Sequence, residues 1–236
     1  AAGLAAAGMR PIVHLYSTFA QRALDQVIHD VCLQKLAVTF LIDRAGIVGA
    51  DGPTHHGVFD QGMVQDLPHL RIGTAADDQA LLAMLRWSLE QEQDATWIRY
   101  AKEDFPGQSR WRSYRPHWWW QAADRSQVML SYGAMAHPAQ AAAEALGWSH
   151  LHVPIYKPFP EGDIREQLKD TKQLITIDEN PRSASLAAAI DRLGLDLERR
   201  DLHLPNHFVP HGTRSELLEE YQLSEAGIRA LVQAWR

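Results

Sequence analysis

One glycine-rich segment gathers the side chains best suited to chemistry. Residues 43–57 read Asp-Arg-Ala-Gly-Ile-Val-Gly-Ala-Asp-Gly-Pro-Thr-His-His-Gly. Arg44 supplies a fixed cation, Asp51 an acid, and His55 and His56 two rings that titrate near neutral pH. The glycines let the backbone approach a ligand closely. Such a set can hold an anion and move a proton. Spacing alone completes no general motif, however, and favours an ordinary glycine-rich surface loop.

The elements around this segment alternate between strand and helix. Residues 17–33 have helical spacing, and Thr74 with Asp77 and Asp78 predicts the start of another helix. Apolar runs predict four buried strands, at 11–15, 36–42, 70–72 and 95–100. This alternation predicts a parallel sheet covered on both faces. Segment 43–57 follows the second strand, beyond the carboxyl end where open α/β sheets bind ligands.

A second alternation follows a proline-rich and tryptophan-rich stretch at 105–125. Its predicted strands are 128–132, 151–155 and 174–178, and its predicted helices are 138–146, 183–193 and 214–221. A chain of 236 residues has room for two ordinary domains. We therefore predict two three-layer α/β domains, at 1–107 and 126–236, with a linker at 108–125.

Composition excludes several classes of function. With 23 Lys and Arg against 29 Asp and Glu, the net charge of -6 argues against a general nucleic-acid surface. Cys32 is the only cysteine, which excludes an intrachain disulfide framework and a cysteine metal cluster. No apolar run approaches the ~20 residues that span a bilayer. We expect a cytoplasmic protein with no metal site of its own, and no nucleic-acid or membrane partner.

The first residues predict the last turns of a small-residue helix that ends at Gly8. A natural chain rarely begins inside a helix. We therefore expect a piece of a longer protein, or one subunit of a split protein.

Three long motifs carry a resemblance to a known family. They are Tyr-Ser-Thr-Phe-Ala-Gln-Arg-Ala-Leu-Asp-Gln-Val-Ile-His-Asp at 16–30, the segment at 42–57, and Leu-Pro-Asn-His-Phe-Val-Pro-His-Gly-Thr-Arg-Ser-Glu-Leu-Leu at 204–218. In this order they resemble the 1-deoxy-D-xylulose-5-phosphate synthases, which are thiamin-diphosphate-dependent members of the transketolase family. The resemblance implies an incomplete pyrimidine-binding domain followed by a transketolase-type C-terminal domain.

The same resemblance implies roles for particular residues. Tyr16 would line the substrate site, and Phe19 would stack on the aminopyrimidine ring of the cofactor, with Arg22 close to that ring. The alternatives are an ordinary core aromatic for Phe19 and a solvent-facing helical arginine for Arg22.

The segment at 43–57 would serve the acceptor. Arg44 would hold the phosphate of the acceptor aldehyde, because its planar fork suits a phosphate. Asp51 and His55 would lie near the reacting carbon, where a histidine can orient an oxygen or move a proton. His56 stands where many relatives have glutamine, and no role is predicted for it.

Three departures from the family pattern limit these expectations. The catalytic glutamate of the family would lie upstream of Ala1, and the domain that holds the diphosphate through Mg²⁺ is absent from this sequence. At 99–103, where relatives carry Arg-Tyr-Pro-Arg-Gly, this chain has Arg-Tyr-Ala-Lys-Glu. Lys102 would replace a second phosphate-binding arginine, with Glu103 beside it.

The implied function is that of a transferase. With the missing upstream half, on the same or another chain, it would condense pyruvate with D-glyceraldehyde 3-phosphate to give 1-deoxy-D-xylulose 5-phosphate and CO₂, for isoprenoid and thiamine biosynthesis. Alone it would be inactive, and a homodimer is expected. The alternatives are half of another transketolase or 2-oxoacid dehydrogenase type enzyme, and a non-catalytic assembly or regulatory partner.

Overall fold

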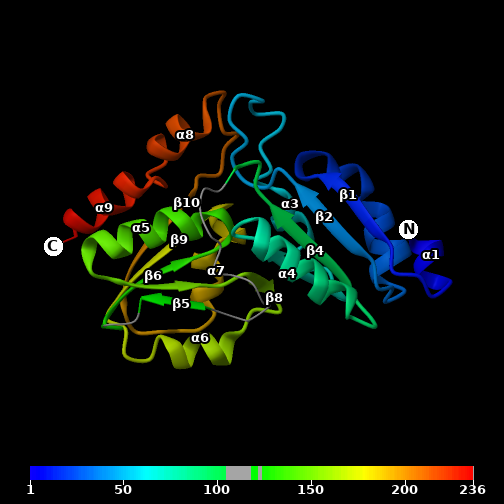
Figure 1. Ribbon diagram of the computed structural model, residues 1–236, viewed down its shortest axis with the longest axis horizontal. Helices are drawn as coiled ribbons and strands as arrows, with labels where there is room; N and C mark the ends of the chain where they lie inside the picture. Colours follow the sequence, from blue (N-terminus) through cyan, green and yellow to red (C-terminus); the bar gives the residue numbers. More distant parts are fainter. Residues whose placement is uncertain (105–117, 122–123, 236) are drawn as a thin grey trace.

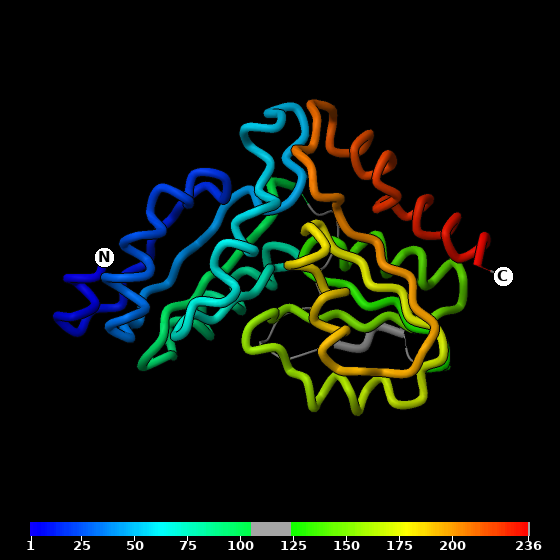
Figure 2. The backbone as a smooth tube through the Cα atoms, turned by 180° about the vertical axis from the view of Figure 1, so that it is seen from behind, coloured from blue at the N-terminus to red at the C-terminus, as the bar shows by residue number. Residues whose placement is uncertain are grey.

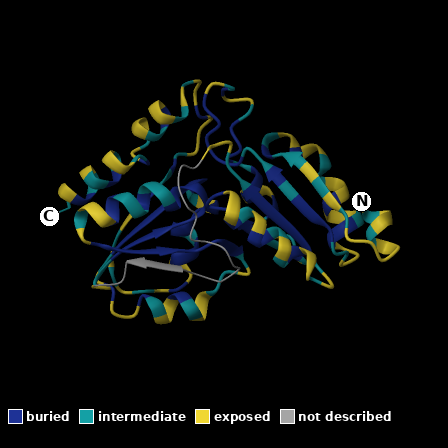
Figure 3. Cartoon of the chain, viewed as in Figure 1, coloured by how far each residue is buried: buried dark blue, intermediate teal, exposed yellow. Residues whose placement is uncertain are grey.

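Two α/β bodies lie side by side in the computed structural model, which describes residues 1–104, 118–121 and 124–235 (Figure 1). Most of the predicted linker at 108–125 lies outside the described residues. The described strands form two five-stranded sheets, the first with order β1-β2-β4-β3-β8 and the second with order β10-β9-β6-β7-β5. Figure 3 shows the interior strands of both sheets largely buried, while helices α8 and α9 expose one face to solvent. The prediction of two α/β units with parallel sheets is confirmed.

The first sheet is parallel over its first four strands. These strands are β1 (Ile12–Tyr16), β2 (Thr39–Asp43), β3 (Leu70–Thr74) and β4 (Ala95–Tyr100). Each falls on or next to a predicted apolar run. Strands β2, β3 and β4 are largely buried and so carry apolar side chains on both faces, whereas edge strand β1 is partly exposed. Helix α4 (Asp78–Leu89) packs on β4 and β2, and the Asp77 side chain caps its first turn by accepting from Ala80 N at 2.9 Å. A short helix, α1 (Ala2–Ala6), precedes β1, as the first residues predict.

The helix predicted at 17–33 changes its winding along its length. It begins as a 3₁₀ helix at Ser17–Ala23, passes through α2 (Leu24–Gln26) and ends as a π helix at Val27–Cys32. Its inward positions Ser17, Ala20 and Val27 are buried. A π segment inside a helix often accompanies a functional site. Here the 3₁₀ end packs on helix α3 (Asp60–Val64), and Thr18 Oγ1 donates to Thr54 O in the 43–57 segment at 3.0 Å.

The second sheet follows the second predicted alternation. Its parallel strands are β6 (Gln127–Ser131), β7 (Ser149–His152), β9 (Gln173–Pro181) and β10 (Glu198–Leu204), and β5 (Trp118–Gln121) runs antiparallel to β7. Its helices are α5 (Ala136–Leu146), α6 (Glu161–Gln167), α7 (Leu186–Asp191), α8 (Arg214–Glu220) and α9 (Glu225–Gln233). Helix α5 packs on β6, β7 and α9, and α7 packs on β9.

The predicted strand at 151–155 is wrong. The chain leaves β7 at His152, and Pro154, which has no N–H to give a ladder, separates it from a new strand β8 (Ile155–Lys157). Strand β8 pairs antiparallel with β3 and so joins the first sheet. The second half of the chain thus covers an edge of the first sheet that would otherwise lie open. The two α/β domains are therefore joined by one hydrogen-bonded strand pair, which the alternation does not predict.

A buried polar network also joins the halves. Arg99 is 2% exposed and uses all five of its N–H groups, two of them on the Asp60 carboxylate at 2.8 and 2.9 Å. The others reach Gln61 Oε1, Thr74 Oγ1 and Gly57 O. From the second half, the Tyr132 hydroxyl donates to Gln61 Oε1 at 2.8 Å. Because every donor of this buried cation has an acceptor, the interface fixes the carboxyl end of β4.

Candidate functional site

The glycine-rich segment, here called the site loop (residues 43–57), is closed at its base. Gly46 N donates to Gly57 O at 2.7 Å, and Gly57 N returns a bond to Gly46 O at 2.9 Å. At Gly57 a Cβ atom would lie 2.1 Å from Arg44 O, so only glycine fits. Figures 1 and 2 show this loop at the edge of the first sheet, beside the segment that leads from β10 to α8. We call that segment the closing segment (residues 205–213).

Two cations of the site converge on one carboxylate. Arg44 Nη1 donates to Asp51 Oδ2, and Lys102 Nζ lies 3.0 Å from the same oxygen. Arg44 has a φ of 61°, the left-handed region that is uncommon outside glycine, so the turn after β2 is strained where it aims this side chain. The hydrogen bond from Lys102, aided by the charges of Lys102 and Arg44, lowers the pKa of Asp51. Asp51 is therefore an ionised acceptor at neutral pH.

Three aromatic rings pack together, and one of them, Tyr16, contacts this cluster. The Phe19 ring lies 5.4 Å from the His55 ring and 5.6 Å from the Tyr16 ring, between centroids. The guanidinium of Arg44 lies 4.4 Å above the centre of the Tyr16 ring, within cation–π range. Residues predicted on two separate motifs, 16–30 and 42–57, are thus in contact.

His55 is oriented by its neighbours. Its Nδ1 is 2.9 Å from the Thr54 hydroxyl, and the carbonyl of Thr54 accepts from Thr18 Oγ1 at 3.0 Å. The ring of His55 is thereby held against the start of the 3₁₀ helix. Nε2 is then the nitrogen that can meet a ligand.

A cavity of about 630 Å³ opens beside Phe19. Phe19 is 44% exposed although it is a large apolar side chain, and Arg22 lies one turn further along the same helix. The cavity is lined by Thr18, Phe19, Gln21, Arg22, Pro53, Thr54, His56, Phe59, Asp60, Met63 and Phe208. An exposed ring on the wall of a largely apolar cavity is suited to stacking with a flat heterocycle. This placement favours the site reading of Phe19 over that of a core aromatic.

His56, for which the sequence predicts no role, fastens the site loop. Its Nδ1 accepts from Val48 N at 3.0 Å, so Nε2 carries the proton and donates to Pro210 O at 3.1 Å in the closing segment. Burial lowers the pKa of His56, which keeps the ring neutral in this role. A contact 154 residues away along the chain leaves no local signal in the sequence.

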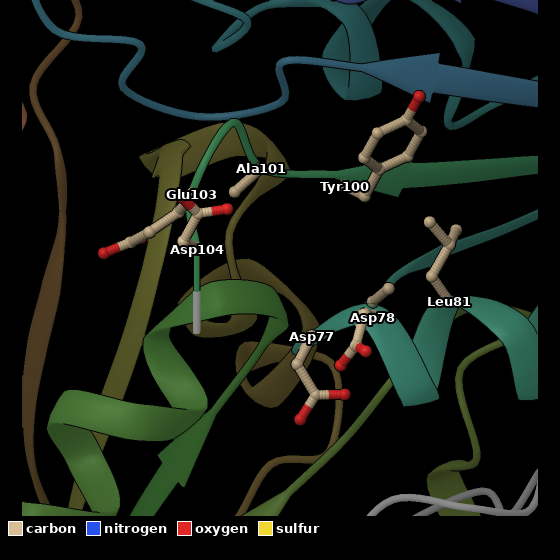
Figure 4. Close-up of a pocket in the computed structure, with 8 residues that line it drawn as sticks. Asp77, Asp78, Leu81, Tyr100, Ala101, Glu103 and Asp104 are labelled. Atoms are coloured by element: carbon tan, nitrogen blue, oxygen red, sulfur yellow. The ribbon is translucent and has the colours of Figure 1, made fainter. Parts of the chain in front are cut away.

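A second cavity, of about 370 Å³, lies behind the end of β4 (Figure 4). Glu103 and Asp104 line it from the end of β4, and Asp77 and Asp78 line it from the start of α4. Four carboxylates disfavour an anionic ligand here. Lys102 instead points to the other side of residues 101–104, where its Nζ lies 3.0 Å from Asp51 Oδ2.

No group of three or more histidine, cysteine or acidic side chains in the part of the chain that the structure describes is arranged to hold a metal ion. The described helices also include none whose length and apolar content suit a membrane crossing.

Comparison with known proteins gives a consistent result along the chain. A family model for the transketolase pyrimidine-binding domain matches residues 1–108, and one for the transketolase C-terminal domain matches residues 121–228. A solved structure described as "Split gene transketolase, inactive beta4 tetramer" has a TM-score of 0.86 and 23% identity, and the match covers 99% of this chain and 78% of that one. That likeness supports the fold.

Curated relatives are more similar in sequence. The 1-deoxy-D-xylulose-5-phosphate synthase of Alkalilimnicola ehrlichii is 36% identical over 244 residues, and that of Cronobacter sakazakii is 36% identical over 243 residues. Each match covers 100% of this chain and 39% of the relative. The chain therefore spans about two fifths of the length of these relatives.

Proposed function

Because the chain belongs to the transketolase family through both of its domains and resembles 1-deoxy-D-xylulose-5-phosphate synthases along its whole length, we propose that it forms the acceptor side of such a synthase. The proposed reaction condenses pyruvate with D-glyceraldehyde 3-phosphate and releases CO₂. The observation that carries this proposal is the convergence of Arg44 and Lys102 on Asp51, beside the rings of Tyr16 and His55.

Thiamin diphosphate fits this chain in part. The cavity beside Phe19 and Arg22 suits the flat pyrimidine ring, and the family implies dependence on this cofactor. When bound, the cofactor supplies an electron sink for the carbon that loses CO₂. Its diphosphate and Mg²⁺ find no such fit, since the described residues offer no metal site. We assign those groups to the upstream part of the enzyme.

The acceptor phosphate fits the cationic cluster. Arg44 offers a planar fork and Lys102 a point charge, and in the free site the Asp51 carboxylate lies between them as an anion would. A phosphate that binds there shares these two cations with Asp51. His55, held through Nδ1, then orients the acceptor oxygen or moves a proton through Nε2.

Reconstitution tests this function directly. We expect no turnover of pyruvate and glyceraldehyde 3-phosphate by the 236-residue chain alone, and turnover when the upstream part, thiamin diphosphate and Mg²⁺ are added. Product formation and CO₂ release are measured together. Turnover by the chain alone would contradict the proposal that the upstream part supplies the groups that bind the diphosphate and Mg²⁺. A reconstituted protein that binds no thiamin diphosphate would instead favour the non-catalytic assembly partner.

A further inference from the structure

Arg214, the first residue of helix α8, contacts three segments that lie far apart in the sequence. Its Nε donates to Glu103 Oε2 at 2.7 Å. Its Nη1 donates to Ile47 O in the site loop and to Glu179 Oε1, both at 2.6 Å, and its Nη2 donates to Glu179 Oε2 at 3.0 Å. Only 12% of the Arg214 side chain is exposed. This one guanidinium therefore links the second domain to both segments that carry the cationic cluster.

The backbone around Arg214 fixes its direction. Thr213 and Glu216 form a reciprocal capping box, in which Thr213 N donates to Glu216 Oε2 at 2.9 Å and Glu216 N to Thr213 Oγ1 at 3.3 Å. The site loop also packs closely here, since a Cβ atom on Gly49 would lie 2.9 Å from Arg214 N. The first turn of α8 and the site loop are therefore held in a single arrangement.

Glu179 completes the connection from the other side. It is 8% exposed, and its Oε1 also accepts from Ile47 N at 3.1 Å. Both backbone groups of Ile47 are thus tied, the carbonyl to Arg214 and the amide to Glu179. Ile47 lies three residues after Arg44, and Glu103 directly follows Lys102. A shift of Arg214 would move both cations relative to each other.

We propose that Arg214 is a positioning residue for the acceptor site: it holds the site loop and residues 101–104 in the geometry that lets Arg44 and Lys102 bind one phosphate together. This inference rests on the proposed function. Arg214 itself touches neither of those cations in the structure, and it acts through Ile47 and Glu103. A guanidinium is required because its fork serves several acceptors at fixed angles, whereas an ammonium is a single point charge.

Titration of the 236-residue chain with inorganic phosphate tests the proposal. Arg214→Lys keeps the charge and removes the fork, so any loss of affinity reports geometry and not net charge. We expect it to raise the Kd for phosphate on the order of tenfold, because small displacements of binding groups are costly. The Kd is measured by NMR chemical-shift titration at low salt. Arg229→Lys is the matched control, since Arg229 is an exposed arginine paired with Glu225 on α9, and its Kd should stay within about twofold of the unaltered chain.

Arg44→Ala separates this inference from the function on which it rests. If Arg44→Ala abolishes phosphate binding while folded Arg214→Lys binds as the unaltered chain does, the positioning role is wrong and the proposed function stands. If Arg44→Ala has no effect, or the unaltered chain binds no phosphate, both are wrong. If Arg214→Lys does not fold, Glu103→Asp replaces it. That variant keeps the charge but shortens the reach to Arg214, and an unchanged Kd would overturn the inference.

Discussion

Under the proposed function, recognition of the phosphorylated acceptor should depend most on Arg44. Replacing Arg44 by Ala in the intact enzyme should lower acceptor kcat/KM by roughly 10- to 150-fold, since charge-assisted hydrogen bonds contribute about 1.5–3 kcal/mol. Release of CO₂ from pyruvate should fall far less. Steady-state kinetics with varied acceptor, together with CO₂ release without acceptor, measure both effects. Unchanged acceptor kinetics with arrested decarboxylation would assign Arg44 to the cofactor instead.

Substitution of Lys102, the second cation of the cluster, tests the same phosphate site. Lys102→Arg should lower the KM for the acceptor or leave it level, because a fork replaces a point charge. Glu103 does not compete for the new guanidinium, since its carboxylate is held by Arg214 at 2.7 Å. Exposed Lys35, on the turn before β2, provides a control, and Lys35→Arg should change no kinetic constant. An acceptor KM raised by Lys102→Arg alone would contradict the expected benefit of a guanidinium at this position.

The sequence predicts those site residues that lie on recognisable motifs. Tyr16, Phe19, Arg44, Asp51 and His55 fall in two such runs, and the structure brings them together. Their roles remain predictions. The residues that fasten the site loop, among them His56 and Arg214, were not found. Pro210 lies 154 residues from His56, and Ile47 lies 167 residues from Arg214, and such contacts have no local spacing.

Strand β7 carries two buried histidines that make stability depend on pH. Ser131 Oγ bonds His150 Nε2 at 2.7 Å and His152 Nδ1 at 3.0 Å. Burial lowers the pKa of His150 to about 3 and that of His152 well below its usual value. The unfolded chain therefore binds more protons than the folded one below about pH 6.5, and stability falls as pH falls. Each histidine contributes a slope of about 1.4 kcal/mol per pH unit there.

Replacing His150 by Gln should reduce the dependence of the unfolding free energy on pH by about 1.4 kcal/mol per pH unit. Urea unfolding between pH 5 and pH 7 measures it, and exposed His207→Gln should leave it unchanged. Asp178 acts in the opposite sense, because burial raises its pKa to about 7, so its contribution falls as pH rises from about 4 to 7. Asp178 is present in both the unaltered chain and the His150→Gln variant, so its contribution cancels when their slopes are subtracted. Equal slopes with and without His150 would show that the ring is not held neutral.

Strand prediction succeeded or failed for identifiable reasons. Strands β2, β4 and β6 are largely buried and mostly apolar, so an apolar run marks each of them. Strand β10 (Glu198–Leu204) was missed because it contains Glu-Arg-Arg-Asp and buries only Leu202 and Leu204. It lies at a sheet edge, where charged residues are common. Helix 17–33 was predicted as one element because apolar spacing does not distinguish α from 3₁₀ or π winding.

At the scale of the whole molecule, several large apolar side chains are exposed on β1 and on the segments that precede and follow it in the sequence. Strand β1 is an edge of the first sheet, and the exposed large apolar side chains near it are Leu4, Met9, Ile12, Ile28 and Leu33. Surfaces of this kind are seldom left in water. We predict that the intact protein is a homodimer at micromolar concentration, measured by light scattering. Leu33→Asp with Ile28→Asp should weaken the dimer if this surface forms its interface. A monomeric intact protein would contradict the prediction.

One strand of the second half pairs in the first sheet, and this limits how the protein can be recombined with its relatives. Strand β8 belongs by sequence to the second half and by hydrogen bonding to the first sheet, where it pairs with β3. A chimaera joined between residues 104 and 118 would therefore place a foreign strand against β3. Its register and side chains would have to match a sheet with which it had not evolved. A graft that carries residues 155–157 from the parent of the first half avoids this mismatch, so the natural unit of exchange is discontinuous in sequence.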